Sequence, residues 1–424
     1  MPPAWFRPRT YAHFDVPVGQ RFAARAEDPA FVAQHSFSPL ISFEKATRRY
    51  KPVSSRVEWK RRPIMFASHR DACILSYYSY LLSKALENAY AEDGTGENVI
   101  AYRALGKANY HFSAEALRFA ITNYPCIVLA YDVTKFFDTL DHGLLKSRLK
   151  NVLKVAELPA DWYAVFRHVT KYHHVAKSDL IAHAVFGERL KLKGRCPVAT
   201  ITELKAAKIE MMANVSNKGI PQGTPISSPL ANLYLRDFDV DIAAHAREVG
   251  GFYRRYSDDI LFICPEPNAP AAEAHIESTL KKERLEISIA KTERTIFDPV
   301  GQKSAQYLGF TLHPSGASIR PGSMSRQWRK MRKAVKKTRA AGQQAIADGK
   351  ADKIYTKRLR RRFTNLQFRN FSSYARRSAE VLGSKQVLRQ VRRLEREFAV
   401  LARGFDDDAP LAAPAPSPGS TGGI

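Results

Sequence analysis

Two carboxylates, Asp258 and Asp259, stand side by side in the stretch RRYSDDILFI. The surrounding segment GFYRRYSDDILFIC predicts two β-strands joined by a tight turn. The simplest reading of an Asp-Asp pair is two exposed turn residues. The apolar ILFI that follows argues against a solvated loop, and burying two acids without a counter-charge costs several kcal/mol. That cost favours a bound metal ion.

A third acid, Asp132, ends the apolar run PCIVLAYDV, which is typical of a buried strand. If Asp132 converges with Asp258 and Asp259, the three form a hard oxygen site suited to Mg²⁺. Two such ions about 4 Å apart activate a 3′-hydroxyl and stabilise a leaving pyrophosphate. The three acids therefore predict nucleotidyl transfer.

The segment KGIPQGTPISSPL carries two glycines, Gly219 and Gly223, that allow the backbone to pass close to a ligand. Gln222 between them can hydrogen-bond while the backbone passes a base pair. The alternative is an ordinary loop before a helix, in which Ser228 is the N-cap and Pro229 the first helical residue.

Two adjacent rings, Phe136 and Phe137, follow Asp132 in YDVTKFFDTLDH. Adjacent phenylalanines most often pack in a core, and we assign Phe136 to the core. Phe137, five residues after Asp132, is the candidate for a role at the site.

The charge of the chain indicates a polyanionic partner. Lys and Arg number 67 against 41 Asp and Glu, a formal net charge of +26. Nucleic acid is the first candidate and an anionic membrane surface the second; a ribosomal or structural RNA binder has the same signature. No apolar run reaches the roughly 18–20 residues of a membrane span, and the N-terminus lacks the apolar core of a signal peptide. The four cysteines are widely spaced, as in reduced thiols of a cytoplasmic protein.

These segments, in this order, resemble the polymerase motifs of bacterial reverse transcriptases over residues 56–312. YDVTKFFDTLDH resembles motif A, KGIPQGTPISSPLANLY motif B and YSDD the motif C tetrad, with Ser where many relatives carry Ala. LEISIAKTE resembles motif D, YLGF motif E, and KRRPI with VIAYR the fingers motifs. The resemblance implies an α+β fold, a right-hand polymerase with fingers, a palm of antiparallel sheet plus helices, and a helical thumb.

The resemblance also assigns roles residue by residue. Asp132 and Asp258, with the backbone carbonyl of Val133, would bind two Mg²⁺ ions, for which Mn²⁺ is an alternative, and Asp259 would act mainly through its charge. Lys291 matches the motif D lysine, a proton donor to pyrophosphate, although a surface lysine is an equal alternative. The remaining implied positions are the triphosphate-binding Arg62 and Arg103, the steric gate Phe137, the nucleotide pocket at Gln222 and Gly223, and a primer grip at Tyr307, Leu308 and Gly309.

The expected domains follow from these motifs. They are an N-terminal extension (1–55), fingers (56–124), a palm (125–320) with a finger insertion around 144–218, a thumb (321–404) and a disordered tail (405–424). Residues 323–403 carry 24 Lys or Arg and five Asp or Glu at helical spacing, as in a thumb that follows the phosphates of a template–primer duplex. A generic basic helical bundle is the alternative.

YAHFD, ASHRDACILSYYSYLL and VIAYRALGK resemble the unknown-group lineage of defence-associated reverse transcriptases, with type 2 as the nearest type. That lineage implies a partner noncoding RNA as template, a cDNA product made from dNTPs, and protection against phage. Three alternatives remain: a retron-type enzyme, a template-independent polymerase of the abortive-infection kind, and a non-catalytic RNA-binding protein of maturase type. Intact acids at positions 132, 258 and 259 argue against the last. The oligomeric state and the trigger have no signature in the sequence.

Overall fold

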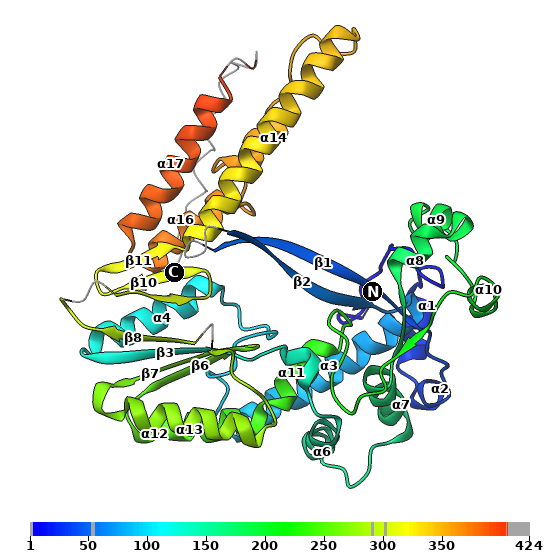
Figure 1. Ribbon diagram of the computed structural model, residues 1–424, viewed down its shortest axis with the longest axis horizontal. Helices are drawn as coiled ribbons and strands as arrows, with labels where there is room; N and C mark the ends of the chain where they lie inside the picture. The colour runs from blue at the N-terminus through cyan, green and yellow to red at the C-terminus, as the bar shows by residue number, and fades with distance from the viewer. Residues whose placement is uncertain (1–2, 52–55, 290–291, 301–302, 404, 406–424) are drawn as a thin grey trace, which may run out of the picture. The chain divides into compact units, whose positions relative to one another are not determined.

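The computed structural model describes residues 3–51, 56–289, 292–300, 303–403 and 405 (Figure 1). The chain forms two compact units. The first comprises residues 1–106 and 125–296, and the second residues 107–124 and 297–424. Helices and strands are mixed in both, which confirms the expected α+β class. Among the described residues, no helix is long and apolar enough to cross a membrane.

The first unit contains most of the strands. Its strands are β1 (Leu40–Lys51), β2 (Arg56–Phe66), β3 (Cys126–Asp132), β4 (His173–Ala176), β5 (Met212–Ala213), β6 (Phe252–Tyr256), β7 (Asp259–Pro265) and β8 (Glu293–Phe297), the last of which crosses into the second unit. Its helices are α1 (Gln20–Ala26), α2 (Pro29–Ala33), α3 (His69–Glu92), α5 (Phe136–Thr139), α6 (His142–Leu153), α7 (Ala160–Thr170), α8 (Lys177–Ala182), α9 (Ala184–Lys191), α10 (Ile201–Ala206), α11 (Ser227–Tyr234), α12 (Arg236–Glu248), the 3₁₀ helix η1 (Glu266–Asn268) and α13 (Ala269–Lys282).

A four-stranded sheet in the order β6-β7-β3-β8 is the palm-like part of this unit. β6 and β3 both pair antiparallel with β7, and the strands alternate little in burial because β3 and β7 are buried on both faces. α12 and α13 pack on the sheet through β6 and β7 (Figure 1). The predicted strands around Asp132 and the Asp258–Asp259 turn are therefore confirmed, and they are neighbours.

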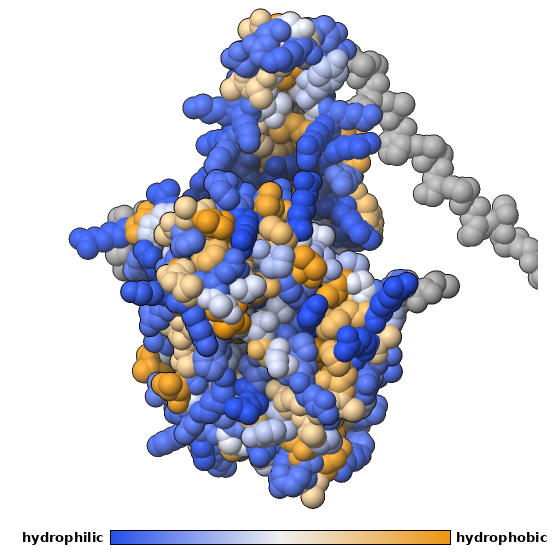
Figure 2. Space-filling view, turned by 90° about the vertical axis from the view of Figure 1, so that its right-hand side faces the viewer, coloured by the Kyte–Doolittle hydropathy of each residue, from blue (hydrophilic) through white to orange (hydrophobic). Residues whose placement is uncertain are grey.

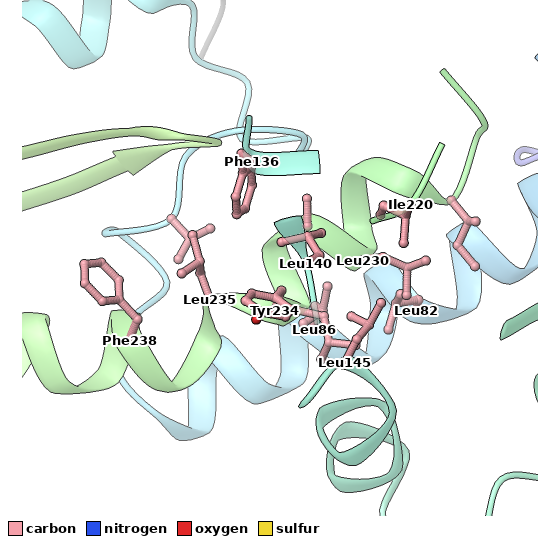
Figure 3. Packing of buried hydrophobic residues seen from close by; sticks show 14 of the residues in the cluster. Leu82, Leu86, Phe136, Leu140, Leu145, Ile220, Leu230, Tyr234, Leu235 and Phe238 are labelled. Atoms are coloured by element: carbon pink, nitrogen blue, oxygen red, sulfur yellow. The ribbon is translucent and has the colours of Figure 1, made fainter. Parts of the chain in front are cut away.

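Packing of α3, α6 and α11 forms the main core beside this sheet. Leu82 and Leu86 of α3 meet Leu230 and Tyr234 of α11, with Leu145 of α6 alongside (Figure 3). These side chains are almost fully buried, so each contributes roughly 1.5–3 kcal/mol of burial free energy. This core holds the segment between motif A and motif B in place.

The start of α11 differs from the prediction. The helix begins at Ser227 after Ile226, so Ser228 is inside the helix and is not the N-cap. The Oγ atom of Ser227 bonds the carbonyl of Pro221 at 2.6 Å and the hydroxyl of Thr224 at 2.6 Å. These bonds fold the preceding turn onto the helix, which sequence propensity for caps does not reveal.

The first 55 residues do not form a separate extension. β1 and β2 pair antiparallel along their whole length, so the expected boundary at position 55 falls between the two strands of one hairpin. Asp15 accepts hydrogen bonds from the backbone N–H groups of His69 (2.8 Å) and Arg70 (2.9 Å), at the start of α3. Strand pairing and this capping carboxylate therefore join the N-terminal residues to the first unit.

The second unit combines α4 (Asn109–Thr122) with the C-terminal part of the chain. Its other elements are β9 (Ala305–Tyr307), β10 (Phe310–His313), β11 (Gly316–Ile319), α14 (Pro321–Ala347), α15 (Lys357–Phe363), α16 (Phe371–Val381) and α17 (Lys385–Leu401). Gln390 of α17 bonds both backbone polar groups of Ile319 in β11, at 2.8 and 3.1 Å. The basic helices thus share a unit with the small sheet that precedes them, and the boundary lies near residue 297 and not at 321. Apart from Phe405, the expected tail lies outside the described residues.

The YLGF segment forms the turn between β9 and β10. Tyr307 ends β9, Phe310 begins β10, and Leu308 and Gly309 have φ values of 43° and 93°. Two successive positive φ values are typical of a two-residue hairpin turn, in which glycine is favoured.

Candidate active site

The three acids of motifs A and C lie at neighbouring strand ends. Asp132, the last residue of β3, is the register partner of Asp259, the first residue of β7. The backbone N–H of Val133 donates to the carbonyl of Asp258 at 3.3 Å. Asp132 and Asp258 are half-buried and Asp259 is exposed. The backbone therefore brings together the acids that the sequence separates widely.

The turn that carries Asp258 is tightly held. Tyr256 and Asp259 are paired across the hairpin, and Ser257 between them has a φ of 61°. The Ser257 hydroxyl, buried inside the turn, receives a hydrogen bond from the hydroxyl of Tyr102 at 3.0 Å. An alanine at this position has no group to accept that bond, so the serine of YSDD ties the turn to the segment around Tyr102.

The buried ion pair of Arg255 and Asp239 supports the same turn. Both guanidinium arms of Arg255 meet the carboxylate of Asp239 in α12: Nε lies 2.7 Å from Oδ1 and Nη2 lies 2.6 Å from Oδ2. Both side chains are 0% exposed. The third nitrogen, Nη1, donates to the carbonyl of Ser257 at 3.0 Å and to Oδ1 of Asn232 at 3.2 Å. The guanidinium group thus links the turn that carries Asp258 to α11 and α12.

The charge of this pair is retained despite its burial. Burial acts to lower the pKa of Arg255, but the adjacent Asp239 carboxylate raises it above its usual value. Tyr253 donates its hydroxyl hydrogen bond to Asp239 at 2.5 Å, and burial raises the pKa of Tyr253 well above its ordinary value. The network is therefore one arginine cation, one carboxylate and neutral donors and acceptors. We did not predict it, although strand alternation places Arg255 on the same face as Tyr253, and a buried arginine requires a partner.

The motif D segment borders Asp132 on its other side. The N–H of Ser288 donates to the carbonyl of Asp132 at 2.8 Å, and the N–H of Thr134 donates to the carbonyl of Glu286 at 2.9 Å. Neither bond uses the carbonyl of Val133, the predicted metal ligand. Lys291 lies outside the described residues.

The types of donor at this site fit a divalent cation. Carboxylate and carbonyl oxygens are the hard ligands that Mg²⁺ prefers. Among the described residues, however, no three His, Cys, Asp or Glu side chains are grouped so that they could hold a metal ion. The three acids are therefore not assembled as a three-carboxylate cage in the described part of the chain, and metal binding by Asp132, Asp258 and the carbonyl of Val133 stays a prediction.

The loop of motif B lies against motif A. The N–H of Ile220 donates to the carbonyl of Phe137 at 2.8 Å, and the N–H of Gly219 donates to the carbonyl of Leu140 at 2.8 Å. Gly219 has a φ of 86°, and a Cβ atom there would lie 2.9 Å from the carbonyl oxygen of Asp138. The half-buried Phe137 ring packs edge-on against Phe136, with 5.6 Å between centroids. The candidate gate and the candidate nucleotide loop are thus directly bonded.

The same loop is tied to β2. The N–H of Met65 donates to the carbonyl of Gln222 at 2.9 Å, and a Cβ atom on Gly223 would lie 2.6 Å from the carbonyl oxygen of Met65. With a φ of 127°, Gly223 also has a backbone conformation that other residues rarely adopt. Arg62, half-exposed, is three residues earlier on β2. The strand that carries this arginine therefore contacts the predicted nucleotide loop.

Arg103 has a different environment from the one expected. Its Nε and Nη2 atoms bond the carboxylate of Glu87 at 2.7 and 2.6 Å, and Nη1 bonds the carbonyls of Gly96 and Val99 at 2.5 and 2.6 Å. The guanidinium carbon also lies 4.5 Å from the centre of the Tyr90 ring. Every nitrogen is used to hold the segment after α3, so triphosphate binding by Arg103 would require these bonds to break.

The predicted primer grip, Tyr307, Leu308 and Gly309, belongs to the second unit, where it forms the β9–β10 turn. Ser113 of α4 lies beside this turn, with its Oγ 3.5 Å from the carbonyl of Tyr307. A role for these residues in holding a primer stays a prediction.

The structure is similar to apo telomerase from Candida tropicalis truncated from its C-terminal domain (TM-score 0.46, 11% identity, 67% of this chain and 56% of that chain). It is also similar to telomerase from Candida albicans in complex with a TWJ fragment of telomeric RNA (TM-score 0.46, 11% identity, 88% and 64%). A third similar structure is the BmCPV RNA-dependent RNA polymerase at elongation state (TM-score 0.42, 13% identity, 70% and 24%).

The chain thus spans 56% and 64% of the length of the two telomerase chains. No curated protein matches the sequence. A family model described as reverse transcriptase (RNA-dependent DNA polymerase) matches residues 70–312, which is more than half of the 424 residues. The chain belongs to the reverse transcriptase family.

Proposed function

We propose that the chain is an RNA-directed DNA polymerase that extends a primer with deoxynucleotides by two-metal nucleotidyl transfer. The observation that carries this proposal is the placement of Asp132 and Asp258 at the ends of two neighbouring strands, with Asp259 as register partner of Asp132. Two Mg²⁺ ions, when bound, activate the primer 3′-hydroxyl and stabilise the leaving pyrophosphate. Mn²⁺ can take the place of Mg²⁺ at oxygen ligands.

The residues of the chain have distinct parts in this proposal. Asp132, Asp258 and the carbonyl of Val133 hold the ions, and Asp259 adds negative charge. Arg255 is a positioning residue, because its bond to the Ser257 carbonyl holds the turn on which Asp258 sits. A fixed turn keeps the metal ligands in one geometry, which lowers the cost of reaching the transition state.

Substrate selection falls to the loop and strand around Phe137. The Phe137 ring excludes a ribose 2′-hydroxyl, Gln222 and Gly223 line the pocket for the incoming nucleotide, and Arg62 binds its triphosphate, since a guanidinium fork matches phosphate oxygens. Arg103 is the weaker candidate for that phosphate role. Lys291 donates a proton to pyrophosphate, and Tyr307, Leu308 and Gly309 hold the primer.

We further propose that the template is a partner noncoding RNA, that the product is its cDNA, and that the protein acts in the bacterial cytoplasm against phage. The support is the resemblance of YAHFD, ASHRDACILSYYSYLL and VIAYRALGK to the unknown-group, defence-associated lineage, and the net charge of +26. Sequencing the nucleic acid that copurifies with the protein tests this part. One structured RNA with complementary cDNA is expected; unrelated cellular RNA without cDNA contradicts it.

Primer extension tests the polymerase proposal itself. A labelled DNA primer is annealed to an RNA template and incubated with the protein, dNTPs and Mg²⁺. The expected product ends at the template terminus and has the complementary sequence. A product whose sequence is not complementary to the template, or that is linked to the protein, would support the template-independent alternative. The absence of any product would support an RNA-binding protein without catalysis.

A further inference from the structure

A pocket of about 500 Å³ opens in the first unit between the N-terminal residues and α7. Residues 33–39, which follow α2, form one wall, and one face of α7 with the residues after it forms the other. α2 and α7 lie side by side (Figure 1). None of the residues assigned to nucleotidyl transfer lines this pocket. A volume in the range of 300–1,000 Å³ is typical of small-ligand sites and fits one nucleotide.

Several aromatic rings line this pocket. The Phe37 ring lies parallel to the His168 imidazole, with 4.3 Å between centroids and 15° between planes. His35 meets Phe37 edge-on at 4.8 Å. Tyr163 also lines the pocket and is 47% exposed. Flat rings on the wall and rim of a pocket offer stacking surfaces for a nucleobase, because every base has a π-face.

Cations surround these rings. Tyr163, Arg167 and Lys171 are spaced four residues apart along α7 and its C-cap, so they share one helix face. Among the described residues, neither Arg167 nor Lys171 forms an ion pair with a carboxylate; Lys171 bonds only neutral acceptors, Ser216 and Asn217, at 3.1 and 3.0 Å. The ammonium group of Lys146 lies 5.5 Å from the centre of the Tyr163 ring. Their positive charge is therefore available to a phosphate.

A buried carboxylate anchors the wall of the pocket that carries Phe37. Asp71, fully buried, accepts from His35 at 2.8 Å and from the N–H of Ser38 at 2.9 Å, which fixes the wall that carries Phe37. The Nε2 atom of His168 is buried and has no hydrogen-bond partner among the described residues. Burial lowers the pKa of His168 to about 4, so the ring is neutral at pH 7.

We propose that this pocket binds one unpaired nucleotide of a single-stranded RNA, with the base against Phe37 and Tyr163 and its phosphate on Arg167 and Lys171. The inference rests on the proposed function only in taking RNA as the partner. It adds an anchoring site for the RNA outside the catalytic centre. Figure 2 shows hydrophilic and hydrophobic residues intermixed over the side of the molecule that faces the viewer.

Fluorescence anisotropy tests the site with two probes, a fluorescein-labelled single-stranded RNA of mixed sequence and the same RNA annealed into a blunt duplex. Tyr163→Ala should weaken single-strand binding roughly five- to hundredfold, the range for one lost stacking contact. Tyr163→Phe should stay within about twofold of wild type, because the ring is kept. Arg167→Gln should weaken single-strand binding, whereas the charge-matched Arg247→Gln, exposed on α12, should not.

Equal single-strand affinity of wild type and Tyr163→Ala overturns the inference, as does an equal loss of duplex and single-strand binding. Photocrosslinking of 4-thiouridine RNA to the wild-type protein gives a second readout that no folding defect can mimic. Crosslinks in peptides covering residues 33–39 or 160–173 are expected, and crosslinks confined to other peptides refute the site. Primer extension by the wild-type protein is scored separately, so failure of the polymerase proposal leaves this binding result distinguishable.

Discussion

Removing Arg255 should damage both the stability of the first unit and catalysis. Arg255→Met leaves the fully buried Asp239 carboxylate with the Tyr253 hydroxyl as its remaining partner. Breaking a buried ion pair by removing one partner costs about 3–5 kcal/mol, of a total stability of about 5–15 kcal/mol. The Ser257 carbonyl also loses its donor, so the turn that carries Asp258 should become mobile.

The double variant Arg255→Met/Asp239→Leu separates the two effects. Replacing both charges with apolar side chains is often neutral for stability, so most of the lost 3–5 kcal/mol, roughly, should return. Activity should not return, because no group then donates to Ser257. Arg61→Met is the control: its pair with Glu44 is 67% and 56% exposed, and its loss should cost under about 1 kcal/mol.

Urea unfolding followed by tryptophan fluorescence measures the stability term, since Trp162 is buried in the core of the first unit. Primer extension measures how far polymerase activity depends on the bond by which Arg255 holds the turn that carries Asp258. If Arg255→Met is as stable as wild type, the buried ion pair between Arg255 and Asp239 does not have the predicted effect on stability. A double variant with full polymerase activity would refute the positioning role and leave only a structural one.

Three further outcomes are expected. Phe137→Ala should admit ribonucleotides, measured as the ratio of rNTP to dNTP incorporation; unchanged selectivity would remove the gate role. Gly223→Ala, whose Cβ would lie 2.6 Å from a backbone carbonyl, should cost about 1–3 kcal/mol and raise the KM for dNTPs. The control Gly19→Ala, with a φ of −103° and no atom within 4 Å of the added Cβ, should cost at most about 1 kcal/mol by urea unfolding. Burial lowers the pKa of His13 and His168 to about 4, below the ordinary value of 6.5. As the pH falls, these histidines are protonated in the unfolded protein before they are protonated in the folded protein. The free energy of unfolding should therefore decrease between about pH 6.5 and pH 4, by of the order of 3 kcal/mol for each histidine. Between pH 6.5 and pH 4, the unfolding midpoint of His13→Gln should fall less than that of wild type. An equal fall in both proteins would show that His13 does not cause the loss of stability.

Local sequence patterns predicted the strands that lie nearest to the three acids. The apolar run before Asp132 and the apolar segments around the turn at Asp258 and Asp259 predicted three strands, because short apolar runs bounded by turn residues are visible in the local sequence. The prediction that the strand ending at Asp132 comes to lie beside this hairpin depended on the resemblance to a family.

Tertiary partners account for what the sequence did not reveal. Arg255 and Asp239 lie on different elements, and nothing in either segment alone names the other as its partner. Arg103 looked suited to phosphate, but the bonds that occupy it come from Glu87, Gly96 and Val99, whose approach depends on how the chain turns after α3. Asp15 likewise caps a helix that begins more than 50 residues later.

The most direct test of the account is primer extension on an RNA template by Asp258→Asn beside Glu157→Gln, an isosteric change at a carboxylate that is 79% exposed. Asp258→Asn keeps the shape of the turn and removes a negative metal ligand. We predict that it abolishes extension while its affinity for single-stranded RNA stays at the wild-type level, and that Glu157→Gln extends normally. Extension by Asp258→Asn at the wild-type rate would contradict the assignment of the catalytic carboxylates.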